Sequence, residues 1–163
     1  MSYIFDIKLD KENVTHYVIQ STMATVALFI AISLPYMDEP ILIAAIGSTS
    51  FIVFAMPESR TANPKNVLGG HLLCGILGLL FFKLHSTLLP LTATIALAVG
   101  ASIFLMVVLD IEHPPAGGTV IFLILNPMVG SLIALLLSAS IISTIATILH
   151  PYLIDLVSSY HRS

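Results

Sequence analysis

The sequence predicts an all-α protein, a polytopic membrane helix bundle with four to six membrane segments. Of its 163 residues, 57% are hydrophobic and only 9% are charged, whereas soluble domains carry about 25% charged residues. Uncharged stretches close to the roughly 20 residues of a bilayer span recur along the chain. The nine glycines and nine prolines follow no repeating triplet, so the chain is neither collagen-like nor, at this hydrophobicity, disordered.

Charged residues divide the chain into apolar segments, because an ionised side chain at the bilayer centre costs at least ~2.5 kcal/mol. The five segments are residues 13–37, 40–57, 66–82, 88–109 and 114–149. The third is short and crosses if Lys83 extends to the interface. The fifth holds 36 residues without a charged side chain, which makes about 54 Å of helix against a hydrocarbon core of ~30 Å. We therefore expect the fifth segment to break.

The break is predicted at Asn126, Pro127 and Gly130, because Pro removes an intrahelical hydrogen bond and Asn and Gly favour turns. This leaves a half-length helix over residues 115–125 and a full span over residues 128–149. One long, kinked span is the alternative. A half-length helix is typical of elements that line a cavity, because irregular backbone at membrane depth must be buried in protein or face water.

We divide the chain into an N-terminal arm (1–12), a single transmembrane domain (13–150) and a C-terminal tail (151–163). Lys and Arg gather on the cytoplasmic side of membrane proteins. The arm carries Lys8 and Lys11, and the loop between the second and third segments carries Arg60 and Lys65. Alternation of the spans puts both on one side of the membrane, with Lys83 on the other. We therefore expect a cytoplasmic N-terminus. The side of the C-terminal tail stays open, because it depends on whether the short helix crosses.

The third and fifth segments open alike. Residues 63–70 are Asn-Pro-Lys-Asn-Val-Leu-Gly-Gly, and residues 113–118 are His-Pro-Pro-Ala-Gly-Gly. The preceding segments also match, with Gly-Ser-Thr-Ser-Phe from Gly47 and Gly-Ala-Ser-Ile-Phe from Gly100. A duplicated helical hairpin is one interpretation. A chance match of small and apolar residues is the other.

Each of these two corners is a predicted helix start that suits an anion. Asn63 and His113 take the cap positions, and a proline follows in the first turn, where its missing N–H costs nothing. Free backbone N–H groups and the positive end of the helix dipole then favour an anion. For any single glycine the alternative is close helix packing. The predicted substrate-binding residues are Ser48, Thr49, Ser50, Asn63, Asn66, Gly69, Gly70, His71, His113, Pro114, Pro115, Gly117 and Gly118.

Within this set His71 is the predicted proton acceptor, because a polar side chain inside a span suggests function and His titrates near pH ~6.5. An interhelical hydrogen bond is the alternative. For His113 the alternative is an interfacial histidine paired with a neighbouring carboxylate. At least two of the three hydroxyls at 48–50 are expected to bond to backbone or to a neighbouring helix. Arg60 and Lys65 are expected to attract anions electrostatically, or to be solvated topology charges.

Other function classes are disfavoured. Six Lys and Arg against nine Asp and Glu, with no basic stripe, make nucleic acid an improbable partner. We predict no metal and no cofactor, because no His-x-x-His, His-x-x-x-His or Cys-x-x-Cys motif occurs, although His71 and His113 could approach in space. We predict no enzyme, because no Gly-x-Ser-x-Gly motif occurs; a serine near His71 is the arrangement an enzyme would need.

Together, His113-Pro114-Pro115 and the Asn-Val-x-Gly-Gly-His element at 66–71 resemble the HPP family of integral membrane proteins. The resemblance implies a protein usually described with four transmembrane helices. Some plant relatives are associated with nitrite transport into plastids, so it also implies nitrite or another small monovalent anion as substrate. No transit sequence rich in Ser and Arg precedes the first segment, so we expect a bacterial inner membrane.

The sequence therefore predicts a carrier or channel for a small monovalent anion, most simply nitrite, with an anion site at the paired helix starts and a proton as possible coupling ion. One small chain makes a thin wall around a pore, so a homo-oligomer in contact with lipid is expected. Its small-residue face, Gly70, Cys74 and Gly78, would serve contacts between or within protomers. The alternative is a non-transporting scaffold or sensor whose His-Pro-Pro loop binds a cytoplasmic partner.

Overall fold

The computed structural model describes residues 11–85 and 88–157, which are helical apart from short connections. The helices are α1 (Lys11–Ile32), α2 (Pro40–Ala55), α3 (Pro64–His85), α4 (Leu91–Val108), α5 (Ala116–Leu125) and α6 (Val129–Leu149), with short 3-10 helices η1 (Arg60–Ala62) and η2 (His150–Tyr152). No strand occurs among these residues. The prediction of an all-α bundle is confirmed.

Four helices of the described chain, α1, α3, α4 and α6, are long and apolar enough to cross a membrane, whereas α2 and α5 are shorter. The fifth apolar segment is thus two helices, and the predicted break is confirmed at residues 126–128. Gly130 lies inside α6 and takes no part in the turn. The alternative of one long, kinked span is wrong.

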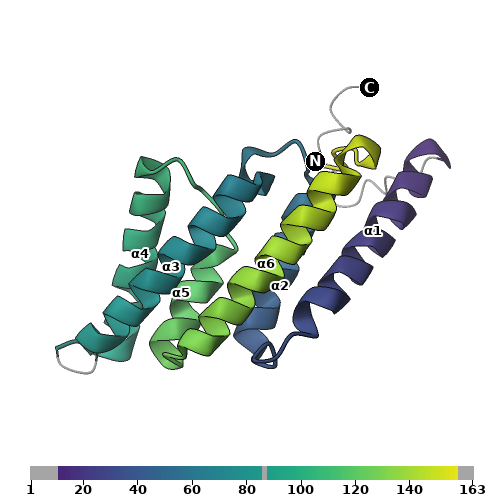
Figure 1. Cartoon of the computed structure of the whole chain (residues 1–163). Coiled ribbons are helices and arrows are strands. Elements are labelled where there is room, and N and C mark those ends of the chain that lie inside the picture. The colour runs from purple at the N-terminus through teal and green to yellow at the C-terminus, as the bar shows by residue number, and fades with distance from the viewer. Residues whose placement is uncertain (1–10, 86–87, 158–163) are drawn as a thin grey trace, which may run out of the picture.

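The helices stand side by side, with α1 at one edge of the bundle and α4 at the other (Figure 1). Helix α5 packs against α2, α3 and α4, and its side chains Phe122, Leu123 and Ile124 are buried. A half-length helix therefore occupies the interior of the bundle, as expected for an element whose ends cannot both reach water.

The C-terminal segment lies at the same end of the bundle as the loop between α2 and α3. Leu156 N donates to the carbonyl of Ala55, the last residue of α2, at 2.9 Å. The side chain of Gln20 in α1 donates to the carbonyl of Ile154 at 2.9 Å and accepts from its N–H at 3.1 Å. The described part of this segment lies at that end because α5 and α6 together return the chain to it.

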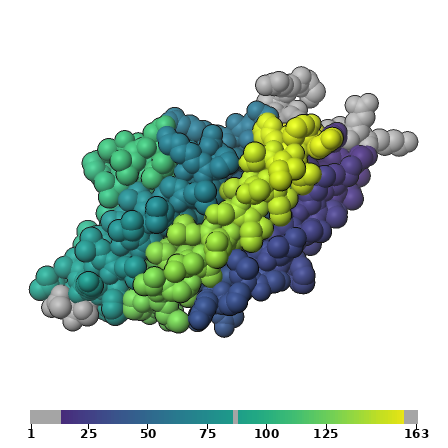
Figure 2. Space-filling view, viewed as in Figure 1, coloured from purple at the N-terminus to yellow at the C-terminus, as the bar shows by residue number. Residues whose placement is uncertain are grey.

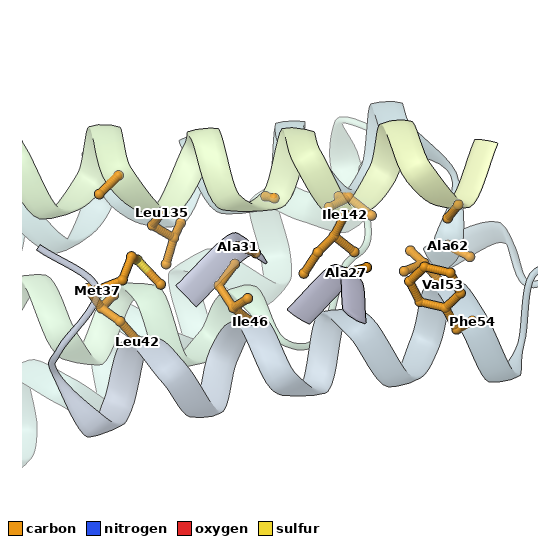
Figure 3. Close-up of a cluster of buried hydrophobic side chains, with 14 of the residues drawn as sticks. Ala27, Ala31, Met37, Leu42, Ile46, Val53, Phe54, Ala62, Leu135 and Ile142 are labelled. Carbon is orange, nitrogen blue, oxygen red and sulfur yellow. The ribbon is translucent and has the colours of Figure 1, made fainter. Parts of the chain in front are cut away.

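Small residues allow the helices to pack closely. One buried cluster joins α1, α2 and α6 and includes Ala27, Ala31, Ile46, Leu135 and Ile142 (Figure 3). Alanines at such positions let backbones approach, which is how helices associate in membranes. On the outside, α6 runs across one face between α1 and α3 (Figure 2), and many large apolar side chains are exposed. Such a surface suits lipid.

The small-residue face of α3 serves contacts within this chain. A Cβ added at Gly78 would lie 2.7 Å from Leu123 Cβ and 3.0 Å from the carbonyl oxygen of Val120, both in α5. Cys74 is fully buried in the cluster between α3, α4 and α5. Of the two expectations for this face, packing within the protomer is therefore the one that the structure displays.

Candidate functional site

The two matching corners lie together inside the bundle. After α4 the backbone turns at Asp110, which has a positive φ of 59°, and Ile111 then packs on Gly69 of α3. A Cβ at Gly70 would lie 2.8 Å from His113 Cβ and 3.3 Å from the carbonyl oxygen of Ile111. Gly70 is six residues beyond Pro64, the first residue of α3. Its contact with His113 therefore lies about 9 Å along the helix axis from the start of α3.

The amides at the start of α3 are not free. Lys65 N donates to Asn63 Oδ1 at 3.0 Å, and the amides of Asn66 and Val67 donate to the carbonyl of Asn63 at 2.9 and 3.0 Å. Pro64 has no N–H. Asn63 thus caps the helix with its own side chain and carbonyl, as Asn commonly does, and leaves no amide there for an anion.

The amides at the start of α5 are also bonded. Two prolines at positions 114 and 115 contribute no N–H. The amides of residues 116–118 each donate to the carbonyl three residues earlier, at 3.0 Å. The expectation of free amides at paired helix starts is therefore wrong, because a capping side chain satisfies one set and a tight first turn satisfies the other.

In place of amides, the corner holds a buried network of side chains. His71 Nδ1 lies 2.8 Å from Thr119 Oγ1, and His71 Nε2 lies 3.0 Å from Thr49 Oγ1. Thr49 Oγ1 also lies 2.9 Å from His113 Nε2, and His113 Nδ1 lies 2.9 Å from the carbonyl oxygen of Thr61. Both rings and both linking hydroxyl residues are fully buried, and the two ring centroids are 5.1 Å apart. We call this set the histidine network.

The approach of the two histidines, which sequence left open, is thus observed. The alternative of an interfacial His113 paired with a carboxylate is wrong, since its ring is buried against Thr49 and the Thr61 carbonyl. Asn66 joins the corner from α3, where its Nδ2 donates to the carbonyl of Glu112 at 3.3 Å.

Only one of the three adjacent hydroxyls belongs to the histidine network. Ser48 is exposed and donates to the carbonyl of Ala44 at 2.8 Å. Ser50 donates to the carbonyl of Ala24 in α1 at 3.4 Å. The prediction that at least two would bond to backbone or a neighbouring helix is confirmed, and the inclusion of Ser48 and Ser50 in the site is corrected.

The glycines of the corner chiefly allow packing. A Cβ at Gly69 would meet Ile111 at 3.0 Å, and one at Gly118 would meet Ala45 Cβ at 3.1 Å. At Gly117 nothing lies within 4 Å. The packing alternative therefore holds at Gly69, Gly70 and Gly118, where neighbouring residues occupy the space that a ligand would need.

The basic residues near the corner are paired at the surface. Arg60 and Lys65 both pair with Asp110, Lys65 at 3.1 Å, which ties the loop before α3 to the loop before α5. Such exposed pairs contribute at most about 1 kcal/mol. Attraction of anions by these cations stays a prediction.

A cavity of about 320 Å³ opens beside the start of α3. Its walls are the loop before α3 and the second half of α6, and they include Arg60, Asn63, Pro64, Thr147 and His150. Asn63, a predicted site residue, thus faces a cavity, whereas the histidine network lies deeper, without exposure. In this structure the corner is closed.

The family model described as "HPP, transmembrane region" matches residues 10–157. The chain belongs to the HPP family. A curated transmembrane protein of Dictyostelium discoideum is 32% identical over 87 residues, which are 53% of this chain and 30% of that protein. The chain thus aligns with less than a third of the length of that relative. No solved structure matches.

The motif of the HPP family is therefore an interior corner in this chain. His113 and Pro115 are buried, and Pro114 alone of the three is exposed. The family's transmembrane region and the apolar helices together make this an integral membrane protein. Within the described residues no three His, Cys, Asp or Glu side chains gather as metal ligands would.

Sequence reasoning missed Thr119 and the carbonyl of Thr61. A signal for Thr119 was present, because it follows Gly-Gly in one corner as His71 follows Gly-Gly in the other. The two equivalent residues contact each other across the pair of corners. The Thr61 carbonyl had no comparable signal, since any loop carbonyl could serve.

Proposed function

We propose that this HPP-family protein transports a small monovalent anion, nitrite first, together with a proton. The observation that supports this is the buried histidine network at the start of an interior half-length helix. Ionisable groups inside a membrane are expensive, face the bundle interior and mark pathways for ions and protons. Interrupted helices near the bilayer midplane are where carriers commonly bind substrate.

The chemistry of the network suits a weakly bound, singly charged ligand. Its polar groups are two imidazoles and two hydroxyls, and the amide of Asn66 lies nearby. None of these carries a fixed positive charge, so binding stays weak enough for release, as conduction requires. Because the backbone amides are bonded within the helix starts, we assign the anion's hydrogen bonds to these side chains.

A bound proton would compensate the charge of the anion. A membrane potential of 100 mV, negative inside, opposes the entry of one anion by ~2.3 kcal/mol. Burial of an uncompensated charge costs several kcal/mol more. If one proton binds with one anion, the buried site carries no net charge. We propose the pair His71 and His113 as the proton acceptor. The cavity beside Arg60 and Asn63 provides the approach, and opening of the corner admits the ions.

The competing class is a scaffold or sensor whose His-Pro-Pro loop binds a partner. That role needs an exposed loop, and here only Pro114 of the motif is exposed. An enzyme is a further class, because Thr49 stands between two imidazoles as a nucleophile stands beside a base. Thr49 is fully buried and does not line the cavity, so we propose no catalytic step.

Uptake by liposomes that contain the purified chain tests the proposal. We expect nitrite to enter faster than into protein-free liposomes, and faster still under an inward proton gradient; nitrate, formate and chloride serve as competitors. Protein-free liposomes correct for passive entry of the neutral acid. Rates equal to those of protein-free liposomes for all four anions would contradict transport.

We further propose a bacterial inner membrane, a cytoplasmic N-terminus and a homo-oligomer. The orientation is supported by the basic loop that contains Arg60 and Lys65. Labelling of cysteines introduced at Thr61, in η1, and at Met128, between α5 and α6, from each side of intact cells tests it. The connection between α2 and α3 and the connection between α5 and α6 lie at opposite ends of the bundle (Figure 1).

A further inference from the structure

The carbonyl of Thr61 fixes the state of His113. A carbonyl only accepts hydrogen bonds, so His113 Nδ1 must carry the hydrogen in this 2.9 Å contact. A neutral imidazole has a hydrogen on one nitrogen only. His113 Nε2 is therefore an acceptor, and the hydroxyl of Thr49, at 2.9 Å, donates to it.

The other half of the network follows from the single hydrogen of a hydroxyl. Thr49 uses its hydrogen on His113, so the 3.0 Å contact with His71 requires His71 Nε2–H to donate to Thr49. His71 Nδ1 is then an acceptor, and Thr119 donates to it at 2.8 Å. Donation runs in one direction, from Thr119 through His71 and Thr49 to His113 and the Thr61 carbonyl.

Thr49 has a second acceptor within reach. Its Oγ1 lies 3.0 Å from the carbonyl oxygen of Ala45, one turn earlier in α2. The single hydrogen cannot serve both His113 and Ala45. The hydroxyl therefore has two alternative positions, and the protonation of His113 decides which one is used.

We propose that the histidine network is a proton-binding site in which the added proton resides on His113 Nε2 while the Thr49 hydroxyl turns to the Ala45 carbonyl. The bond formed is His113 Nε2–H, the bond broken is an O–H bond of the hydronium ion that delivers the proton, and no covalent bond breaks in the protein. The Thr49 oxygen then accepts from the Nε2–H groups of both histidines and donates to Ala45. Every donor of the network stays satisfied, which is the condition for burying such a group.

The hydrogen bonds favour His113 over His71 as the place of the positive charge, because His113 Nδ1–H already donates to the Thr61 carbonyl and keeps this bond when Nε2 is protonated. Helices α2 and α5 bring no ionisable side chain to the network. The buried carboxylate oxygen Oε2 of Glu112, next in sequence to His113, has no hydrogen-bond partner within the described residues. His71 of α3 is the ionisable side chain with a ring contact to His113, at 5.1 Å between centroids. The other ionisable residues in η1, at the start of α3 and in the loop of His113 are Arg60, Lys65, Asp110 and Glu112.

This inference deepens the proposed function and rests on it only for its effect on uptake. The sequence alone predicted His71 as the proton acceptor, and the hydrogen bonds of the network assign the proton to His113 instead. It also makes Thr49 a positioning residue, which acts through the two rings. His71 holds Thr49 in place and keeps its Nε2–H form throughout.

Nitrogen-15 NMR of histidine-labelled full-length protein in detergent tests the assignment. At pH 8 we expect His71 as the Nε2–H form and His113 as the Nδ1–H form, with His71→Asn and His113→Asn identifying the signals. On acidification His113 should gain its second N–H while His71 is unchanged. Identical forms of the two rings at pH 8, or protonation of His71 first, would overturn the proposal.

Variants of Thr49 separate this role from simple packing. Thr49→Val keeps the shape and removes the hydroxyl, so His71 should turn to its Nδ1–H form and donate to Thr119, while Thr49→Ser should leave both rings unchanged. Ser48→Ala, one residue away and outside the network, is the matched control. An unchanged His71 in Thr49→Val would overturn the proposal.

Uptake distinguishes failure of the site from failure of transport. Thr49→Val should lower proton-driven nitrite uptake about tenfold, the equivalent of one buried hydrogen bond, and Thr49→Ser should retain it. Assigned ring states without any uptake by the wild-type chain would contradict transport and support the proton site. Uptake by a chain whose two rings share one form would contradict the proton site alone.

Discussion

His113→Ala should abolish the response of nitrite uptake to a proton gradient. The substitution removes the atom assigned to carry the proton, and it leaves the hydroxyl of Thr49 to turn permanently to Ala45. Proteoliposome uptake at outside pH 5.5 and 7.5, with the inside at 7.5, measures the response. We expect a wild-type ratio well above one and a ratio near one for the variant.

Two further variants make this prediction specific. His71→Ala should lower uptake but retain a pH response, because His113 keeps its bond to the Thr61 carbonyl. His85→Ala, at the C-terminal end of α3, the helix that contains His71, should show the uptake and the pH response of the wild type. If the His113→Ala protein folds and keeps the wild-type ratio of uptake at pH 5.5 to uptake at pH 7.5, the assignment of the proton to His113 is contradicted.

Gly70→Ala is expected to have the largest effect on stability at the site. The added Cβ would lie 2.8 Å from His113 Cβ and 3.3 Å from the carbonyl oxygen of Ile111, neither of which is the end of a flexible side chain. The corner must move away from α3, at a cost of about 1–3 kcal/mol for overpacking. We expect a lower melting temperature in detergent and loss of proton-driven uptake together.

Gly47→Ala is the matched control, because nothing lies within 4 Å of a Cβ at that position. It should leave the melting temperature unchanged or raise it, since Ala favours helix over Gly by about 1 kcal/mol. Equal melting temperatures for Gly70→Ala and the wild type would show that the corner does not need this close approach.

The sequence was most informative where length and covalent chemistry left few choices. A charge-free run of 36 residues exceeds any bilayer, and Asn126 followed by Pro127 is a natural place to end a helix. The short interior helix followed from these facts. The likeness of the two corners likewise indicated that they belong together, since in each of them a polar residue and a proline precede two glycines.

The sequence was least informative about which atoms are free. Whether an amide at a helix start is available depends on the rotamer of a capping side chain such as Asn63, and on whether the first turn is tight. Neither is encoded in a motif. The choice of Thr49 over its two serine neighbours depends on the rotation of α2 about its axis. Because α2 is apolar on all sides, its sequence does not indicate which face points to the interior of the bundle.

Simultaneous recording of nitrite and proton entry tests the central claim most directly. Liposomes containing the wild-type chain, with the membrane potential held at zero and an inward nitrite gradient, should take up one proton per nitrite above the protein-free rate, and His113→Ala should not. Nitrite entry without proton entry above that background would show that the histidine network carries no proton with the anion.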